Sequence, residues 1–209
     1  MKSKAVFLTF FLIIGFSFLR CNNDNCGDYV SSPYFDIQDV AMTNFIYESS
    51  NELTGIGKNR QVSKNETTLI FLDYSVEYHA QTTPHEPFSI THTAYGCTPL
   101  EDGHAGSKDE ILENLTIVTL NDFDANHLAN DTINDLFRVP SHEYYQVFVG
   151  TGETLNTFLT QNTAPIKKED LFLELLQKPT LNDTFQVKIM MELSTDEVYE
   201  MESLPFVFY

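Results

Sequence analysis

The chain has 209 residues, of which 30 are Asp or Glu and 12 are Lys or Arg, so its net charge is −18 at pH 7. A surface this negative repels polyphosphates and anionic lipid headgroups, which excludes nucleic acid as a partner and a charged patch as a membrane anchor. The length suffices for one domain with a sizeable core, and the 17 Phe and 10 Tyr favour β-structure.

Residues 1–20 have the pattern of a secretory signal peptide. Lys2 and Lys4 form a basic start, and residues 5–19 carry no charge and are mostly apolar. This run is shorter than the roughly 20 residues of a membrane-spanning helix and fits the apolar region of a signal peptide. The sequence therefore predicts export, with residues 21–32 as a polar tether and residues 33–209 as a single β-sandwich domain.

Beyond residue 33, apolar and polar side chains alternate in several runs, as they do in half-buried strands. We expect a short strand and then a break within 33–47, and a long polar loop over 48–65. Further strands are expected at 68–78, 88–95, 111–120, 142–149, 170–178 and 185–193, with 198–209 returning as the second strand of a C-terminal hairpin. Short helical segments are expected at 132–137 and 154–159. The run 111–120 is apolar on both faces and therefore predicts a central strand.

These elements predict an all-β fold. Seven to nine short antiparallel strands separated by loops, with one or two short helices, are typical of an Ig-like β-sandwich. The sequence contains no internal repeat and no linker to a second domain.

The three cysteines predict how the N-terminal part is attached. Cys21 directly follows the apolar run, a position that resembles the lipidated cysteine of bacterial lipoprotein signals. Such signals usually carry a small residue where this chain has Arg20, so ordinary cleavage nearby and an uncleaved anchor stay open as alternatives. Cys26 and Cys97 then form an even pair, which either makes a disulfide between tether and domain or stays as two thiols.

One loop has the composition of a calcium site. Its candidate oxygen ligands are Asp122, Asp124, Asn126 and Asp131. The alternation resembles the start of an EF-hand, but His127 and Ile133 stand where that loop requires Gly and Glu. Two interpretations follow: a different calcium-binding loop, or an Asx-rich turn whose side chains bond to their own backbone.

No catalytic motif is present, so the sequence favours a non-enzymatic role and leaves enzymatic activity undecided. Ser141 and His142 are neighbours, but neighbouring side chains on a strand point to opposite faces. Four histidines within one stretch lack the local spacing of a metal site, so surface positions are expected for them. They are His79, His85, His92 and His104.

Four short segments together resemble an uncharacterised family of Bacteroidetes-type cell-envelope lipoproteins, a domain of unknown function. They are 34–37 (YFDI), 94–97 (AYGC), 108–111 (KDEI) and 121–124 (NDFD). The resemblance implies a β-sandwich at the cell envelope and transfers no site residues.

The expected function is that of an exported, lipid-anchored protein of the bacterial cell envelope, in the outer membrane or at the cell surface. Its rigid sheets would present loops to an unknown protein or glycan ligand, or to an assembly partner. One alternative is a secreted hydrolase acting on glycan or peptide. Another is a structural subunit that pairs by an edge strand. The sequence leaves the ligand, the membrane leaflet and the oligomeric state open.

Overall fold

Most of the described chain is β-structure, as the alternation of apolar side chains predicts. The computed structural model describes residues 34–48, 52–79, 105–143 and 146–209. Strands account for 55% of it, and it contains one short α-helix. The prediction of a mostly β fold built from antiparallel sheets is confirmed.

The described part contains twelve strands, more than the seven to nine expected. They are β1 (Tyr34–Tyr47), β2 (Leu53–Gly55), β3 (Gln61–Val62), β4 (Thr67–His79), β5 (Leu112–Thr119), β6 (Phe137–Glu143), β7 (Gln146–Thr154), β8 (Asp170–Leu175), β9 (Thr184–Phe185), β10 (Val187–Leu193), β11 (Val198–Glu202) and β12 (Phe206–Phe208). The helical segments are η1 (Asn134–Leu136), a 3-10 turn, and α2 (Leu155–Gln161).

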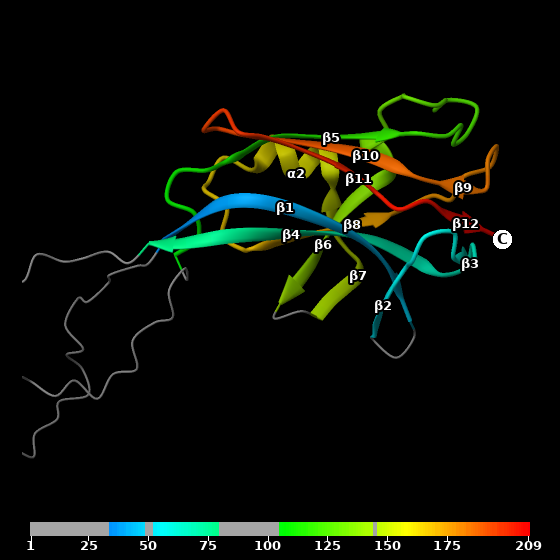
Figure 1. Cartoon of the computed structure of the whole chain (residues 1–209), viewed down its shortest axis with the longest axis horizontal. Coiled ribbons are helices and arrows are strands. Elements are labelled where there is room, and N and C mark those ends of the chain that lie inside the picture. Colours follow the sequence, from blue (N-terminus) through cyan, green and yellow to red (C-terminus); the bar gives the residue numbers. More distant parts are fainter. Residues whose placement is uncertain (1–33, 49–51, 80–104, 144–145) are drawn as a thin grey trace, which may run out of the picture. The chain divides into compact units, whose positions relative to one another are not determined.

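Three sheets organise these strands. A six-stranded antiparallel sheet, in the order β2-β1-β4-β8-β6-β7, curls into a half-barrel. A three-stranded antiparallel sheet, β11-β10-β5, runs along one side of β1 and β4 (Figure 1). The small sheet β3-β12-β9 closes the end where the chain terminates, and its β12–β3 pair is parallel.

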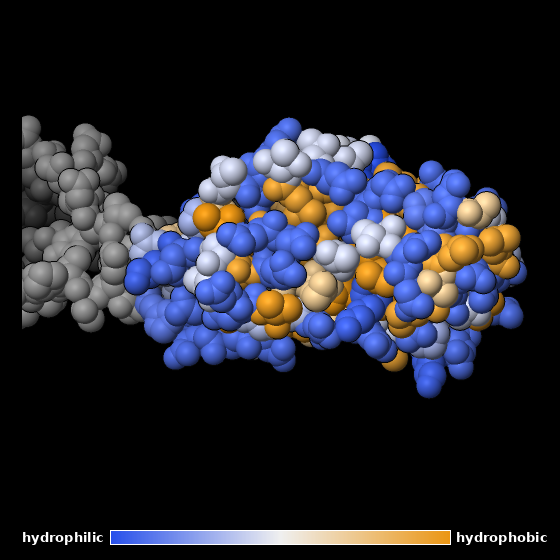
Figure 2. Space-filling model, turned by 90° about the horizontal axis from the view of Figure 1, so that it is seen from above, coloured by the Kyte–Doolittle hydropathy of each residue, from blue (hydrophilic) through white to orange (hydrophobic). Residues whose placement is uncertain are grey.

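The main core lies between the six-stranded sheet and the β11-β10-β5 sheet. Side chains from both sheets, among them Leu72, Leu173, Ile117 and Ile189, belong to one buried cluster. On the opposite face of the six-stranded sheet, Leu69 and its neighbours form a second, smaller cluster. The outer face of the β11-β10-β5 sheet carries hydrophilic residues between small apolar patches (Figure 2). The alternation along β10 thus separates a buried face from a more exposed one, whereas β8 is buried on both faces.

The strand at 34–47 differs from the expectation of a short strand and a break. β1 is continuous over 14 residues and has a register shift between Ile37 and Asp39. It pairs with β4 from Tyr34 opposite His79 to Tyr47 opposite Thr67. Because the long partner strand satisfies the backbone on both sides of the bulge, the local irregularity does not end the strand.

The predicted central strand at 111–120 is wrong in its position, although the strand itself is present as β5. β5 lies at the edge of the β11-β10-β5 sheet. Its outer side is bonded by the following loop: Ile117 N–H donates to Asn134 Oδ1 at 2.8 Å, and Ile117 O accepts from Ile133 N–H at 2.8 Å. The loop thus satisfies the edge of β5 as a neighbouring strand would, and the buried face of β5 carries Leu115 and Ile117.

The strand predicted at 142–149 is also wrong, because two antiparallel strands share it. His142 and Glu143 end β6, and Gln146 begins β7. The segment contains no Gly, Pro, Asn or Asp to indicate a turn, so the alternation continues across the boundary. The expected strand at 88–95 lies outside the described residues.

Three further expectations are wrong in part. The single strand expected at 198–209 is β11 and β12, which belong to different sheets because Pro205 interrupts the ladder, and the strand expected at 185–193 is shared by β9 and β10. The loop expected at 48–65 contains the short strands β2 and β3.

The strands at 68–78 and 170–178 are confirmed as β4 and β8, and β10 forms the expected hairpin with β11. α2 begins after Thr154, whose hydroxyl accepts from Thr157 N–H. In the described ranges, no helix is both long enough and apolar enough to span a membrane.

Lys178 is a half-buried cation beside the small β3-β12-β9 sheet, and it gives a pH-dependent prediction. Its Nζ donates to Thr68 Oγ1 at 2.9 Å and lies 4.9 Å from the centre of the Phe208 ring. Burial lowers the pKa of Lys178 to about 8, although Glu174 and Glu66 oppose this shift. The folded state therefore disfavours the charged amine, and the stability lost in this way returns as pH rises from 8 through the unfolded pKa of about 10.4.

We expect Lys178→Met to be more stable than the wild type at pH 7. The gain is at most about 3 kcal/mol, from 1.4 kcal/mol per pKa unit, less the lost hydrogen bond. Urea unfolding at a series of pH values from 7 to 10.5 should show the advantage shrinking as pH rises. Lys58→Met, which replaces an exposed lysine, should change stability by less than about 0.5 kcal/mol throughout. A constant Lys178→Met difference across this range would contradict the prediction.

Candidate functional site

A cleft opens where β6 and β8 separate within the six-stranded sheet. β8 pairs with β4 from Asp170 to Glu174, but the ladder of β8 with β6 covers only Phe137 and Arg138 of β6. The register of β6 against β7 then shifts between Val139 and Ser141. Pro140, at the shift, has no N–H for a ladder, so β6 turns away from β8 and follows β7.

Gly152, on β7, permits this bulge. Its φ is +86°, and a Cβ at this position would lie 2.0 Å from Val139 O. No larger residue fits against the bulged backbone. Gly150 also has a positive φ, +78°, but a Cβ there would meet no atom within 4 Å. The close approach at Gly152 thus holds the bulged part of β6 against β7.

The cleft has a volume of about 540 Å³, within the usual range for small-molecule sites of about 300–1,000 Å³. The loop of residues 162–168 and Phe158 of α2 form its far wall. Its apolar lining comprises Leu112, Val139, Pro140, Phe158, Ala164, Pro165, Ile166 and Leu171. Mostly apolar walls of this size are typical of pockets that bind small organic molecules.

A histidine–aspartate pair bridges the gap between the separated strands. His142 Nε2, from β6, lies 2.8 Å from Asp170 Oδ1, at the start of β8. The two side chains are 9% and 16% exposed, and the His142 ring meets the Phe172 ring edge-on at 5.2 Å between centres. The pair replaces the missing ladder bonds and places two hydrogen-bonding side chains at the cleft.

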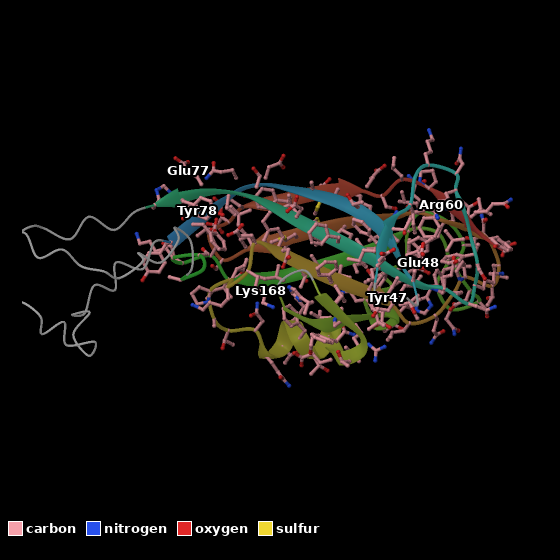
Figure 3. The ribbon with its side chains drawn as sticks, turned by 90° about the horizontal axis from the view of Figure 1, so that it is seen from below. Tyr47, Glu48, Arg60, Glu77, Tyr78 and Lys168 are labelled. Carbon is pink, nitrogen blue, oxygen red and sulfur yellow. The ribbon has the colours of Figure 1, made fainter. Side chains whose placement is uncertain are left out.

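Tyr74 and two lysines complete the polar part of the cleft. Burial, and secondly the charge of Asp170, raise the pKa of the Tyr74 phenol, so the phenol stays neutral. Lys168 Nζ donates to the backbone oxygen of His142, and Lys167 Nζ donates to Ala105 O at 3.1 Å. Lys168 is labelled in Figure 3 beside the start of β8. The cleft therefore combines an apolar interior with hydrogen-bonding and charged groups.

Activation of a nucleophile by His142 would require a hydroxyl or thiol hydrogen-bonded to its ring. No hydroxyl or thiol of the described residues hydrogen-bonds to the His142 ring, whose polar partner is Asp170. Ser141 pairs with Phe148 on β7 and is exposed.

A second hollow, near the start of β1, is acidic and has a structural role. The carboxylate of Glu110 accepts from Ile37 N–H at 2.9 and 3.2 Å and from Ser107 Oγ at 2.7 Å. Burial is the main cause that raises the pKa of Glu110, against the lowering effect of these hydrogen bonds. Glu110 therefore anchors the β1 bulge at Ile37 to the loop that precedes β5.

The candidate calcium loop directs its carboxylates to its own backbone. Asp124 Oδ1 accepts from Asn126 N–H at 2.8 Å and from His127 N–H at 2.9 Å. Asp122 Oδ1 accepts from Ala129 N–H, and Asp131 Oδ2 from Leu128 N–H. The hydrogen bond from Asn126 is the main cause that lowers the pKa of Asp124. These contacts match the Asx-rich turn, one of the two interpretations, and calcium binding stays a prediction.

No group of three or more His, Cys, Asp or Glu side chains in the described ranges is arranged to hold a metal ion. The other predicted site residues, Cys21, Cys26 and Cys97, lie outside the described residues, so lipidation and the disulfide stay predictions. His85, His92 and His104 also lie outside them, while His79 Nε2 lies 2.8 Å from Asp36 Oδ2.

The cleft was missed at the level of sequence. His142 and Asp170 are 28 residues apart and form no recognisable motif. The sequence contained only indirect signals of the cleft. Pro140 lies within a run of alternating residues and Gly152 lies nearby, and both residue types often mark a bulge.

The fold and the cleft together define a mostly β protein with a cleft of small-molecule size where its six-stranded sheet separates. No protein-family model matches the chain, and no match was found among curated proteins or among solved structures. The geometry of the cleft is therefore the basis of the functional proposal.

Proposed function

We propose that the chain is an exported, lipid-anchored envelope protein that acts as a binding module, with the cleft between β6 and β8 as its ligand site. The observation that carries this proposal is the cleft itself: about 540 Å³, mostly apolar walls and the His142–Asp170 pair. Such pockets, with few convergent polar groups, are the usual form of ligand sites.

Export and anchoring are supported by the leader. Its basic start and apolar run fit a secretory signal, and Cys21 is placed for lipidation. The membrane would then be a partner through the lipid alone, at the outer membrane or cell surface of a bacterium. The resemblance to Bacteroidetes-type envelope lipoproteins agrees with this location. Two layers packed around one core agree with an Ig-like sandwich, which we retain as part of the proposal.

A hydrolase is the second candidate, because the His142–Asp170 pair resembles the base and orienting group of many hydrolases. Binding is preferred because the described residues place no nucleophile on the His142 ring. Turnover of a glycan or peptide that is lost on His142→Gln and retained on His79→Gln would favour the hydrolase instead.

Lipidation is tested by metabolic labelling. We expect a labelled fatty acid to be incorporated into the wild type and not into Cys21→Ser, because only a thiol at this position accepts the lipid. Cys26→Ser is the control and should label like the wild type. Equal labelling of Cys21→Ser and the wild type would overturn the lipoprotein part of the proposal.

Ligand binding is tested with the neutral fluorophore N-phenyl-1-naphthylamine, whose emission rises in apolar sites. We expect the full chain to bind it with one-to-one stoichiometry. Ala164→Trp, which adds an indole to the cleft lining, should weaken binding by at least about tenfold through steric exclusion. Thr163→Trp, at the neighbouring position that does not line the cleft, is the control and should bind like the wild type. Equal binding by Ala164→Trp would show that the cleft is not the site.

A further inference from the structure

The charged side chains around the cleft indicate which charge its ligand would carry, an inference that rests on the proposed binding function. Lys167 and Lys168 are exposed, adjacent in sequence and part of the cleft lining. Each ammonium group donates to a backbone oxygen, of Ala105 and His142 respectively, and neither forms an ion pair with a described carboxylate. An ammonium group has three donors, so each lysine keeps donors for a ligand.

What distinguishes the two lysines is their place at the cleft. Acidic residues outnumber Lys and Arg by 30 to 12, and three described cations form ion pairs: Lys64 with Asp183, Arg138 with Glu174 and Lys188 with Glu200. The cleft lining also holds two carboxylates: Asp170, which is hydrogen-bonded to His142, and Glu153. Two cations without a carboxylate partner therefore stand beside an apolar cavity.

We propose that the cleft binds a small monocarboxylate with an apolar body. The body would lie against Phe158, Ile166 and Leu171, and the carboxylate would accept hydrogen bonds from Lys167 and Lys168. Charge-assisted hydrogen bonds of this kind are stronger than those between neutral groups. The net charge of −18 repels anions from the rest of the surface, so any anion that binds must be held by local contacts.

The test uses three probes with the same ten-carbon chain: decanoate, decanol and decylammonium. The chain contains no Trp, so Phe158→Trp provides a single reporter in the cleft wall. For each probe, the Trp emission of Phe158→Trp is measured. Binding to the unmodified full chain is measured separately by isothermal titration calorimetry. The calorimetry needs no variant, so the result does not depend on how Phe158→Trp folds.

We expect decanoate to bind one-to-one and at least about tenfold more tightly than decanol, the difference of one charge-assisted hydrogen bond. Lys167→Met/Lys168→Met should remove this preference, while Lys58→Met, in an exposed loop, should retain it. Decylammonium should bind the acidic surface weakly and without one-to-one stoichiometry.

Two results would overturn the proposal in different ways. If decanol or decylammonium binds one-to-one as tightly as decanoate, the carboxylate assignment fails and the cleft remains the binding site. If no probe binds in calorimetry and none changes the Phe158→Trp emission, both the ligand class and the proposed binding function fail.

Discussion

A Val187→Asp variant is expected to be unfolded, with no cooperative thermal transition. Val187 is completely buried in the main core and lies on β10, between β5 and β11. Its side chain faces the same way as those of Ile189 and Met191, which are also completely buried. A carboxylate at this position would be a charge with no cationic partner in an apolar environment.

The size of this effect follows from the balance of stability. A buried, unpaired charge destabilises by several kcal/mol even after relaxation, while the net stability of a domain is about 5–15 kcal/mol. Circular dichroism during heating measures the outcome. Val198→Asp makes the same substitution on β11 at a position that is 55% exposed, and it should cost about 1 kcal/mol or less. A normal melting curve for Val187→Asp would show that the assigned inner face of β10 is wrong.

Glu174→Ala is expected to have the next largest effect, a loss of about 3–5 kcal/mol, typical of breaking a buried ion pair. The Glu174 side chain is 9% exposed and that of Arg138 is 23% exposed. Arg138 donates from Nη2 to Oε1 at 3.0 Å and from Nε to Oε2 at 3.3 Å, and Gly150 N–H donates to Oε2 at 2.9 Å. Glu174 thus connects β8 to β6 and β7.

Removal of this carboxylate leaves a guanidinium group and a backbone N–H without their acceptor. Urea unfolding at neutral pH measures the loss. Glu200→Ala is the matched control, because its pair with Lys188 is exposed on both sides and should contribute less than about 1 kcal/mol. Replacement of both partners, in Arg138→Met/Glu174→Met, should recover part of the loss. Similar losses for Glu174→Ala and Glu200→Ala would contradict the importance of the buried pair.

The elements that sequence predicted well are those whose alternation is bounded by turn residues. β10 alternates through its whole length and β4 from Leu72 to Val76, and Asn or Asp lies in the segments beside them, at Asn65, Asn182 and Asp196. The strand at 142–149 lacks such a boundary, so one expected strand proved to be parts of two. β1 was underestimated because the pairing of a 13-residue partner carries it past an irregularity. In both cases the deciding interaction comes from another strand.

The two candidate sites also differ in whether they depend on local or on distant contacts. The Asx-rich loop was recognisable because its hydrogen bonds join residues within a few positions, as Asp124 and Asn126 show. The cleft was not recognisable, because it depends on where the β6–β8 ladder ends. That end point depends on the bulge at Pro140 and on the contact of Gly152 with Val139 O, across two strands.

Local alternation and composition were enough to establish the β-rich fold, the acidic surface and most strand positions, because each depends on residues near one another in the chain. Only the folded chain determined the strand order, the edge position of β5, the split between β6 and β8, and the His142–Asp170 pair. These features depend on pairing between distant segments. A period of two specifies which side of a strand is buried, but not which strand lies beside it.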